Sequence, residues 1–126
     1  MKYQQQLDMT DCGAACIAMI ASHFGKKLSI AEVRGKAGTD IIGTNINGIL
    51  MASRKYGLKG NAVKGGPAAI TPKLSVPFIV HMHIVRDEEN WVDHFVVVRK
   101  ITKNKIVVWD PDPLYKKQKM TYEQFF

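Results

Sequence analysis

Apolar residues near the start of the chain recur at helical spacing. The first ten residues are polar and predict an extended segment, after which Thr10 or Asp11 is a candidate helix cap. Apolar positions three and four residues apart follow, and Gly25 is the expected stop. The predicted buried face of this helix consists of Ile17, Ile20, Ala21 and Phe24.

Two further helices are predicted before residue 58. Ser29 and Glu32 have the spacing of a capping box, and this helix is expected to end near 35–38. The next helix is expected to begin near Thr44 and to stop at Gly57. Its predicted buried positions are Ile46, Ile49 and Leu50.

The second half of the chain contains several short β-rich segments that predict strands. A short strand is expected at 58–63, a turn of helix at 68–74, and a final helical turn capped by Thr121. The other predicted strands cover 77–85, 91–101, 105–109 and 114–120. Helices followed by an antiparallel sheet indicate an α+β class. Without a repeat or a linker, residues 1–126 are expected to form one domain.

The composition narrows the class of protein. Hydrophobic residues make up 46% of the chain, which is enough for a core without a disulfide scaffold. Two cysteines exclude a cluster of cysteine metal ligands or several bridges. No apolar run has the length of a membrane span, and the N-terminus lacks the apolar core of a signal peptide. These features predict a reducing, cytoplasmic setting.

The net charge of +7 raises nucleic acid, a membrane surface or an acidic ligand as partners. The basic excess is spread over both halves, with its densest groups at 99–105 and 116–119. Both groups are expected in turns or exposed strands, where lysine solvates the surface or protects a sheet edge. No nucleic-acid-binding motif or interleaved surface aromatics accompany them, so nucleic acid is not the expected partner.

Cys12 is the first candidate for chemistry. It lies at the predicted N-terminus of the first helix, where the helix dipole and free N–H groups favour a thiolate, and Gly13 leaves the backbone open to a ligand. A small cysteine packed into the core is the equal alternative. Cys16, one turn further along among alanine and isoleucine, is predicted to be structural.

A thiolate of this kind needs a base, and the chain has four histidines. His23 ends the first helix, where a cation suits the dipole. His81 and His83 share one strand face, but no third metal ligand accompanies them, so a polar strand face is the preferred interpretation. His94 shares a face with Val96 and Val98 and is the remaining candidate.

Asp110 is the candidate for orienting His94. A three-residue loop between 94–101 and 105–110 would place Asp110 diagonal to His94 on the same face. A two-residue loop would place its carboxylate on the opposite face. The catalytic interpretation therefore requires the odd loop or a β-bulge, and a turn-forming aspartate before proline is the alternative. For Asp112 the turn is preferred.

A cysteine at a helix N-terminus, with a histidine and an aspartate on adjacent strands, has the logic of a cysteine peptidase. An oxyanion hole is also required. The backbone N–H of Cys12 can supply one donor, and Gln4, Gln5 or Gln6 the other. The sequence pattern does not show which of the three glutamines supplies this second donor.

Three segments together resemble a known family. They are Gln6-Leu-Asp-Met-Thr-Asp-Cys-Gly-Ala-Ala-Cys16, Asp93-His-Phe-Val-Val-Val98 and Trp109-Asp-Pro-Asp-Pro113. They resemble the double-glycine leader peptidases, the bacteriocin-processing cysteine peptidases at the N-terminus of peptidase-containing ABC exporters. The resemblance implies a papain-like fold. It also implies that Cys12 is the nucleophile, His94 the general base, Asp110 the residue that orients it, and Gln6 the oxyanion-hole glutamine.

The resemblance implies a function as well. The chain is expected to cleave bacteriocin, lanthipeptide or pheromone precursors after a Gly-Gly or Gly-Ala pair, with no cofactor in this domain. The implied partners are a precursor with a helical leader and the transmembrane and ATP-binding domains of an exporter, at the cytoplasmic face of a bacterial membrane. Some relatives lack the cysteine and only bind, so a non-catalytic leader-binding domain is the alternative. The chain is expected to be the N-terminal part of such an exporter.

Overall fold

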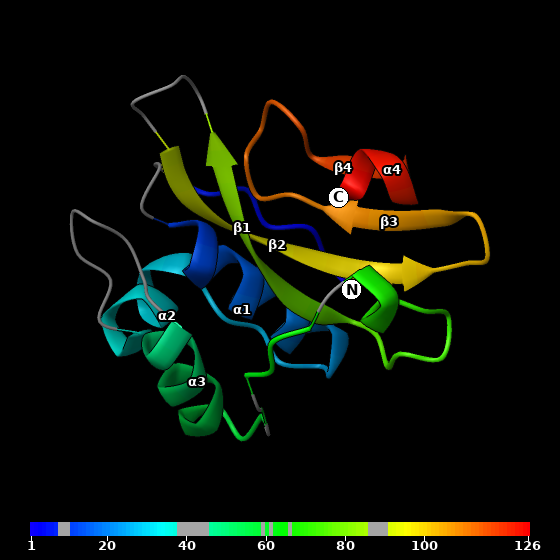
Figure 1. Cartoon of the computed structure of the whole chain (residues 1–126). Coiled ribbons are helices and arrows are strands. Elements are labelled where there is room, and N and C mark those ends of the chain that lie inside the picture. The colour runs from blue at the N-terminus through cyan, green and yellow to red at the C-terminus, as the bar shows by residue number, and fades with distance from the viewer. Residues whose placement is uncertain (8–10, 38–45, 59, 61, 66, 86–90) are drawn as a thin grey trace.

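The structure is a computed structural model that describes residues 1–7, 11–37, 46–58, 60, 62–65, 67–85 and 91–126. Its elements follow the predicted order of helices and then strands (Figure 1). Within the described residues, no helix is long and apolar enough to cross a membrane. The elements are α1 (Cys12–His23), α2 (Ile30–Ala37), α3 (Ile46–Lys55), a 3₁₀ turn (Pro67–Ala69), β1 (Phe78–Val85), β2 (Trp91–Ile101), β3 (Lys105–Trp109), β4 (Lys117–Thr121) and α4 (Tyr122–Phe125).

The four strands form one antiparallel sheet in the order β1-β2-β3-β4. Helix α1 packs on β2 and β1, and α2 and α3 pack around α1 (Figure 1). Short α4 packs on β3 and β4. The apolar residues accordingly fall into two cores, one between α1–α3 and the sheet and one beside α4. This α+β arrangement is the predicted class.

Helix α1 is buried on nearly every side, from Cys12 to Met19. Ile17 and Ala21 are buried as predicted, but Phe24 is 60% exposed and is not part of the core. The reason is that α1 ends at His23, so Phe24 is the cap residue and leaves the helical face. Gly25 follows with φ +81°, which confirms the predicted stop.

The second and third helices also confirm their expected ends. Ser29 Oγ accepts a hydrogen bond from the Glu32 backbone N–H at 3.1 Å, as a cap at this position requires. Gly57 has φ +77° just past α3. Thr44, the expected start of α3, lies outside the described residues. Of the expected buried positions in α3, Ile49 is buried and Leu50 is half-buried, but Ile46 is exposed because it opens the helix.

In the second half, β2 and β3 have the bounds that the sequence predicted, and β1 and β4 start one and three residues later than expected. The expected strand at 58–63 is wrong for the described residues of that range, which are irregular. The predicted helical turn after 67 is the short 3₁₀ turn. Thr121 and Gln124 form a complete capping box at α4, which confirms the predicted cap.

Gly25 and Gly35 offer a matched test of backbone conformation. A Cβ at either position meets no atom within 4 Å, but Gly25 has a positive φ whereas Gly35 lies inside α2. Gly25→Ala is therefore expected to lower the free energy of unfolding by about 1 kcal/mol. Gly35→Ala is expected to raise it by about 0.5–1 kcal/mol. Urea denaturation measures both, and equal effects would contradict the assigned conformations.

Candidate active site

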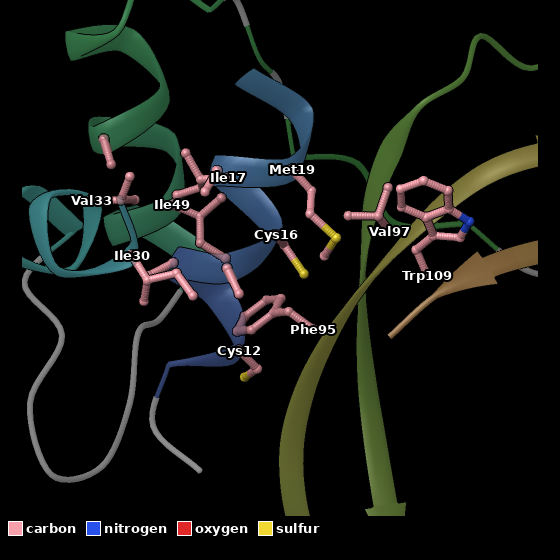
Figure 2. Close-up of a cluster of buried hydrophobic side chains, with 14 residues drawn as sticks. Cys12, Cys16, Ile17, Met19, Ile30, Val33, Ile49, Phe95, Val97 and Trp109 are labelled. Atoms are coloured by element: carbon pink, nitrogen blue, oxygen red, sulfur yellow. The ribbon is translucent and has the colours of Figure 1, made fainter. Parts of the chain in front are cut away.

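Cys12 is the first residue of α1, and its side chain is almost fully buried. Figure 2 shows it at the start of the helix beside the ring of Phe95, with Cys16 one turn further along. The thiol therefore lies at the positive end of the helix dipole, where backbone N–H groups are free to receive a negative charge. The sequence left two interpretations of Cys12 open, a reactive thiol at a helix N-terminus and a cysteine packed into the core. In the structure Cys12 is buried and also lies at the helix N-terminus, so the two interpretations are compatible.

Asp11 is the N-cap of α1, yet its side chain makes no capping hydrogen bond. It is completely buried and forms an ion pair with Arg34 of α2, with 2.8 Å between Oδ1 and Nη1. A buried carboxylate needs such a partner. The pair therefore ties the residue before Cys12 to the second helix and neutralises a charge beside the thiol.

The hairpin between β2 and β3 has a two-residue loop. Thr102 N–H donates to the Lys105 carbonyl at 2.8 Å, which leaves only residues 103 and 104 at the tip. In a regular ladder, this loop would place the Asp110 carboxylate on the face opposite His94. A β-bulge in one of the two strands avoids this outcome, because it shifts the register by one residue.

The structure contains that bulge. The register of β2 against β3 shifts between Val98 and Lys100, and beyond it Val97 lies opposite Trp109. Continued by one residue, this register places Asp110 opposite residue 96, on the face of His94. The prediction that the two side chains meet is confirmed, because His94 Nε2 and Asp110 Oδ1 are 2.7 Å apart.

His94 Nε2 is bound to Asp110, and the Cys12 thiol lies close enough to act on the pKa of the ring. Since Nε2 binds the carboxylate, Nδ1 is the ring nitrogen left for the thiol. Burial lowers the pKa of His94, but the hydrogen bonds to Asp110 and Cys12 and their negative charges outweigh it and raise the pKa to about 9. At neutral pH the site therefore contains an imidazolium beside the thiol.

The loop that carries Asp110 is fixed by its own backbone. Asp110 Oδ1 also accepts a hydrogen bond from the Asp112 N–H at 2.8 Å, and the Asp110 N–H donates to the Lys116 carbonyl at 2.8 Å. Asp112 Oδ1 accepts from the Leu114 N–H at 2.9 Å, the turn predicted for this residue. Asp110 thus forms a turn and binds His94 at once, so the two interpretations of this residue do not exclude each other.

The N-terminal segment is attached to the same loop. The Tyr3 hydroxyl donates to the Asp110 carbonyl, and the Gln6 N–H donates to the Pro111 carbonyl at 2.9 Å. The Tyr3 ring also packs edge-on against Trp109, with 6.1 Å between centroids. These contacts hold the backbone of Gln6 next to the segment that positions His94.

Among the three glutamines, Gln6 alone is buried, with 8% of its surface exposed. Its Oε1 has no hydrogen-bond partner among the described residues. A buried amide oxygen without a partner is uncommon in a folded protein and requires an explanation, such as a group kept for a ligand. Turning the amide by 180° presents NH₂ at the same place, so Gln6 can donate there.

The residues expected to have no chemical role lie elsewhere. Cys16 is fully buried, and burial raises the pKa of its thiol well above the usual range. The exposed His23 ring packs edge-on against Phe24 at the end of α1. His81 stacks on Phe95, and the described part of the chain holds no group of three metal-ligating side chains.

Sequence reasoning missed two residues around the site, Tyr3 and Arg34. Each acts across a long sequence separation, on Asp110 and on Asp11 respectively. Neither has a local pattern that would identify it, since an isolated tyrosine or arginine is compatible with any exposed surface.

Helices packed on an antiparallel sheet, with a thiol at the N-terminus of the central helix and a histidine–aspartate pair on the strands, define a papain-like α+β fold. The chain belongs to the Peptidase C39 family, whose sequence profile matches residues 1–126.

Curated relatives agree with this family. The chain is 34% identical to the pediocin PA-1 transport/processing ATP-binding protein PedD of Pediococcus acidilactici, over 98% of this chain and 17% of that protein. It is 37% identical to the lactococcin-G-processing and transport ATP-binding protein LagD of Lactococcus lactis subsp. lactis, over 98% of this chain and 16% of that protein. The chain thus spans about a sixth of the length of these relatives.

Solved structures show the same fold. The peptidase domain of Streptococcus ComA, a bifunctional ABC transporter of a quorum-sensing pathway, has a TM-score of 0.85 and 33% identity, over 98% of this chain and 90% of that one. A double-glycine-motif protease from an AMS/PCAT transporter, in complex with its leader peptide, has a TM-score of 0.82 and 25% identity, over 98% and 81%. The predicted fold and family resemblance are confirmed.

Proposed function

We propose that the chain is a cysteine endopeptidase that removes the leader from a bacteriocin- or lanthipeptide-type precursor after a Gly-Gly or Gly-Ala pair. The observation that carries this proposal is the His94–Asp110 pair, with 2.7 Å between Nε2 and Oδ1, together with the buried Cys12 at the N-terminus of α1. A nucleophile, a proton carrier and an orienting carboxylate within hydrogen-bond reach are the parts that covalent acyl transfer requires.

Acylation begins with attack of the Cys12 thiolate on the carbonyl carbon of the residue before the scissile bond. The negative charge passes to the carbonyl oxygen, which receives hydrogen bonds from the Cys12 backbone N–H and the Gln6 amide. His94, protonated at neutral pH, gives its proton to the departing amine. The C–N bond breaks, the mature peptide leaves, and the leader stays on Cys12 as a thioester.

Hydrolysis reverses the proton movement. His94, now neutral, takes a proton from water, which attacks the thioester carbonyl. The C–S bond breaks, the leader leaves with a free carboxylate, and the thiolate–imidazolium pair forms again. Asp110 holds the imidazole with Nε2 toward itself in both halves of the reaction, so Nδ1 stays available to the reacting groups.

The names of the relatives support the wider setting. PedD and LagD are described as processing and transport proteins, and the AMS/PCAT protease was solved with a leader peptide. In this proposal the domain is the N-terminal part of an ABC exporter and lies at the cytoplasmic face of the bacterial membrane. Its partners are the precursor with its helical leader and the transmembrane and ATP-binding domains.

Substrate cleavage followed by mass spectrometry tests the proposed reaction. A synthetic precursor with Gly-Gly before the scissile bond is expected to be cut once, directly after the second glycine. The matched control replaces that glycine by leucine and is expected to stay intact, because the proposal requires a narrow channel at this position. Equal cleavage of both peptides, or cleavage elsewhere, would contradict the proposed specificity.

Gln6 provides a separate test of the oxyanion hole. Gln6→Ala is expected to lower kcat by about 10²–10³-fold with a much smaller change in KM, because the lost donor acts on the charge that develops in the transition state. Gln6→Glu, similar in size but without the NH₂, is expected to be at least as impaired. The exposed Gln5→Ala is the matched control. An equal loss in Gln5→Ala would remove Gln6 from the assignment.

A further inference from the structure

Five basic side chains lie together on one face of the sheet, across strands β2, β3 and β4. We call this set the basic face; its members are Arg99, Lys100, Lys105, Lys117 and Lys119. All are exposed except Lys105, which is half-buried. None of these residues takes part in the proposed reaction, so the face requires a separate explanation.

The strand register establishes that these residues share a face. Lys117 is opposite Trp109 and Lys119 is opposite Val107, and Val107 is also opposite Lys100. Arg99, the extra residue of the bulge, places its guanidinium 4.8 Å from the centroid of the Trp109 ring. Because alternate residues of a strand point to opposite faces, Lys105 lies on this same side, two residues from Val107.

The helices leave this part of the sheet open. Helix α1 packs on β1 and β2, whereas α4 packs on β3 and β4 together with the core of Ile106, Val108 and Met120, which is the other face. The described side chains of β2, β3 and β4 include no aspartate or glutamate. Among the described side chains, the basic face is therefore a broad cationic area with no carboxylate on its strands.

An exposed apolar pair lies in the loop between β3 and β4, directly before the lysines of β4 in the sequence. Leu114 is 84% exposed and Tyr115 is 51% exposed, in the loop that leads into Lys116 and Lys117. Exposure to water does not stabilise a leucine side chain, so the position of this pair directly before Lys116 and Lys117 requires another explanation. An apolar group and an amphipathic ring next to basic residues are the combination that inserts into the headgroup region of a bilayer.

We propose that the basic face and the Leu114–Tyr115 pair dock the domain on an anionic phospholipid surface. The lysines spread over three adjacent strands rather than along a groove, which suits a planar layer of headgroups. The Trp109 ring is buried beneath Arg99 and Lys117, so this ring offers no surface on which a nucleobase could stack. The inference rests on the proposed function, which holds the domain beside a membrane as part of an exporter.

Sedimentation with lipid vesicles tests the proposal on the 126-residue chain. Vesicles of phosphatidylcholine with about one third phosphatidylglycerol are expected to bind it, and pure phosphatidylcholine vesicles are not. Lys100→Gln/Lys119→Gln is expected to weaken binding about 25-fold, since each basic residue near an anionic surface is worth about fivefold. Lys27→Gln/Lys73→Gln, with the same charge change elsewhere, is the matched control and is expected to bind almost as the wild type. At high salt, where the attraction between the lysines and the lipid headgroups is screened, Leu114→Ser/Tyr115→Ser is expected to weaken the vesicle binding that remains.

The outcomes separate this proposal from the peptidase function. Cleavage of a soluble Gly-Gly peptide without vesicles is expected to be unchanged in Lys100→Gln/Lys119→Gln, so loss of vesicle binding with intact cleavage supports the proposal. Absence of wild-type binding to anionic vesicles, or equal weakening in the control pair, overturns it. A raised KM for an acidic leader in Lys100→Gln/Lys119→Gln overturns it in favour of the substrate, and tighter binding to duplex DNA than to vesicles overturns it in favour of nucleic acid.

Discussion

Cys12→Ala is expected to lower cleavage of a Gly-Gly precursor by about 10⁴-fold or more, while the leader still binds. The expected size follows from other covalent peptidases, in which loss of the nucleophile removes almost all catalysis beyond that of binding and the oxyanion hole. Binding is preserved because the thiol lies at the end of α1 and the helix retains its packing with alanine there. Mass spectrometry measures cleavage, and calorimetry with the leader peptide measures binding.

Cys16→Ala is the matched control for this variant. It removes the only other thiol of the chain, one turn along the same helix, at a position that is fully buried. Stability is expected to fall by about 1–2 kcal/mol because a small cavity forms, with kcat almost unchanged. If Cys12→Ala cleaved as well as the wild type, the nucleophile assignment would be wrong. If the wild type bound the leader without turnover, the domain would be a leader-binding module.

Asp110→Asn is expected to move the alkaline limit of activity. His94 must be protonated to release the amine, and its pKa of about 9 places the fall in kcat/KM near pH 9 in the wild type. The asparagine keeps an acceptor for Nε2 but removes the negative charge, so the limit is expected to fall toward the ordinary histidine value of about 6.5. At pH 8 the loss is expected to be roughly 10–100-fold, and at pH 6 much smaller.

The same pair makes stability depend on pH in a fixed direction. Since the pKa of His94 is raised in the folded state, the stabilisation by Asp110 and Cys12 is fully present below about pH 6.5. It is lost as pH rises through about 9. Asp110→Asn is expected to flatten this loss in urea denaturation between pH 6 and 10. Asp112→Asn, whose side chain makes a turn, is the control, and a shift of the pH limit in that variant would contradict the assigned role of Asp110.

The sequence predicted that His94 and Asp110 could meet, but not how the strands bring them together. Strand parity placed His94 and Asp110 on one face only if the hairpin had an odd loop or a bulge, and no residue pattern chose between these devices. The structure uses the bulge at Arg99, which keeps a tight two-residue loop and still aligns the two side chains. A bulge depends on the packing of both strands, so a local pattern cannot reveal it.

For the helices, the sequence predicted where each helix ends better than which of its residues are buried. Glycines and caps predicted their ends well, because a positive φ at Gly25 and Gly57 and a hydroxyl at Ser29 act locally. Which residues are buried was predicted less well, since Phe24 and Ile46 are exposed at helix termini while every residue of α1 from Cys12 to Met19 is buried. Burial of that kind is decided by neighbouring elements.

The rate of thiol alkylation tests the central claim, the Cys12–His94–Asp110 site, without any substrate. Native protein is treated with iodoacetamide between pH 5 and 9, and each cysteine is assigned by peptide mass spectrometry. Cys12 is expected to react rapidly, because the histidine beside it activates a nucleophilic thiol, whereas the buried Cys16 stays unmodified. His94→Ala is expected to lose this rapid reaction. Equally slow modification of Cys12 in the wild type and in His94→Ala would contradict the proposed site.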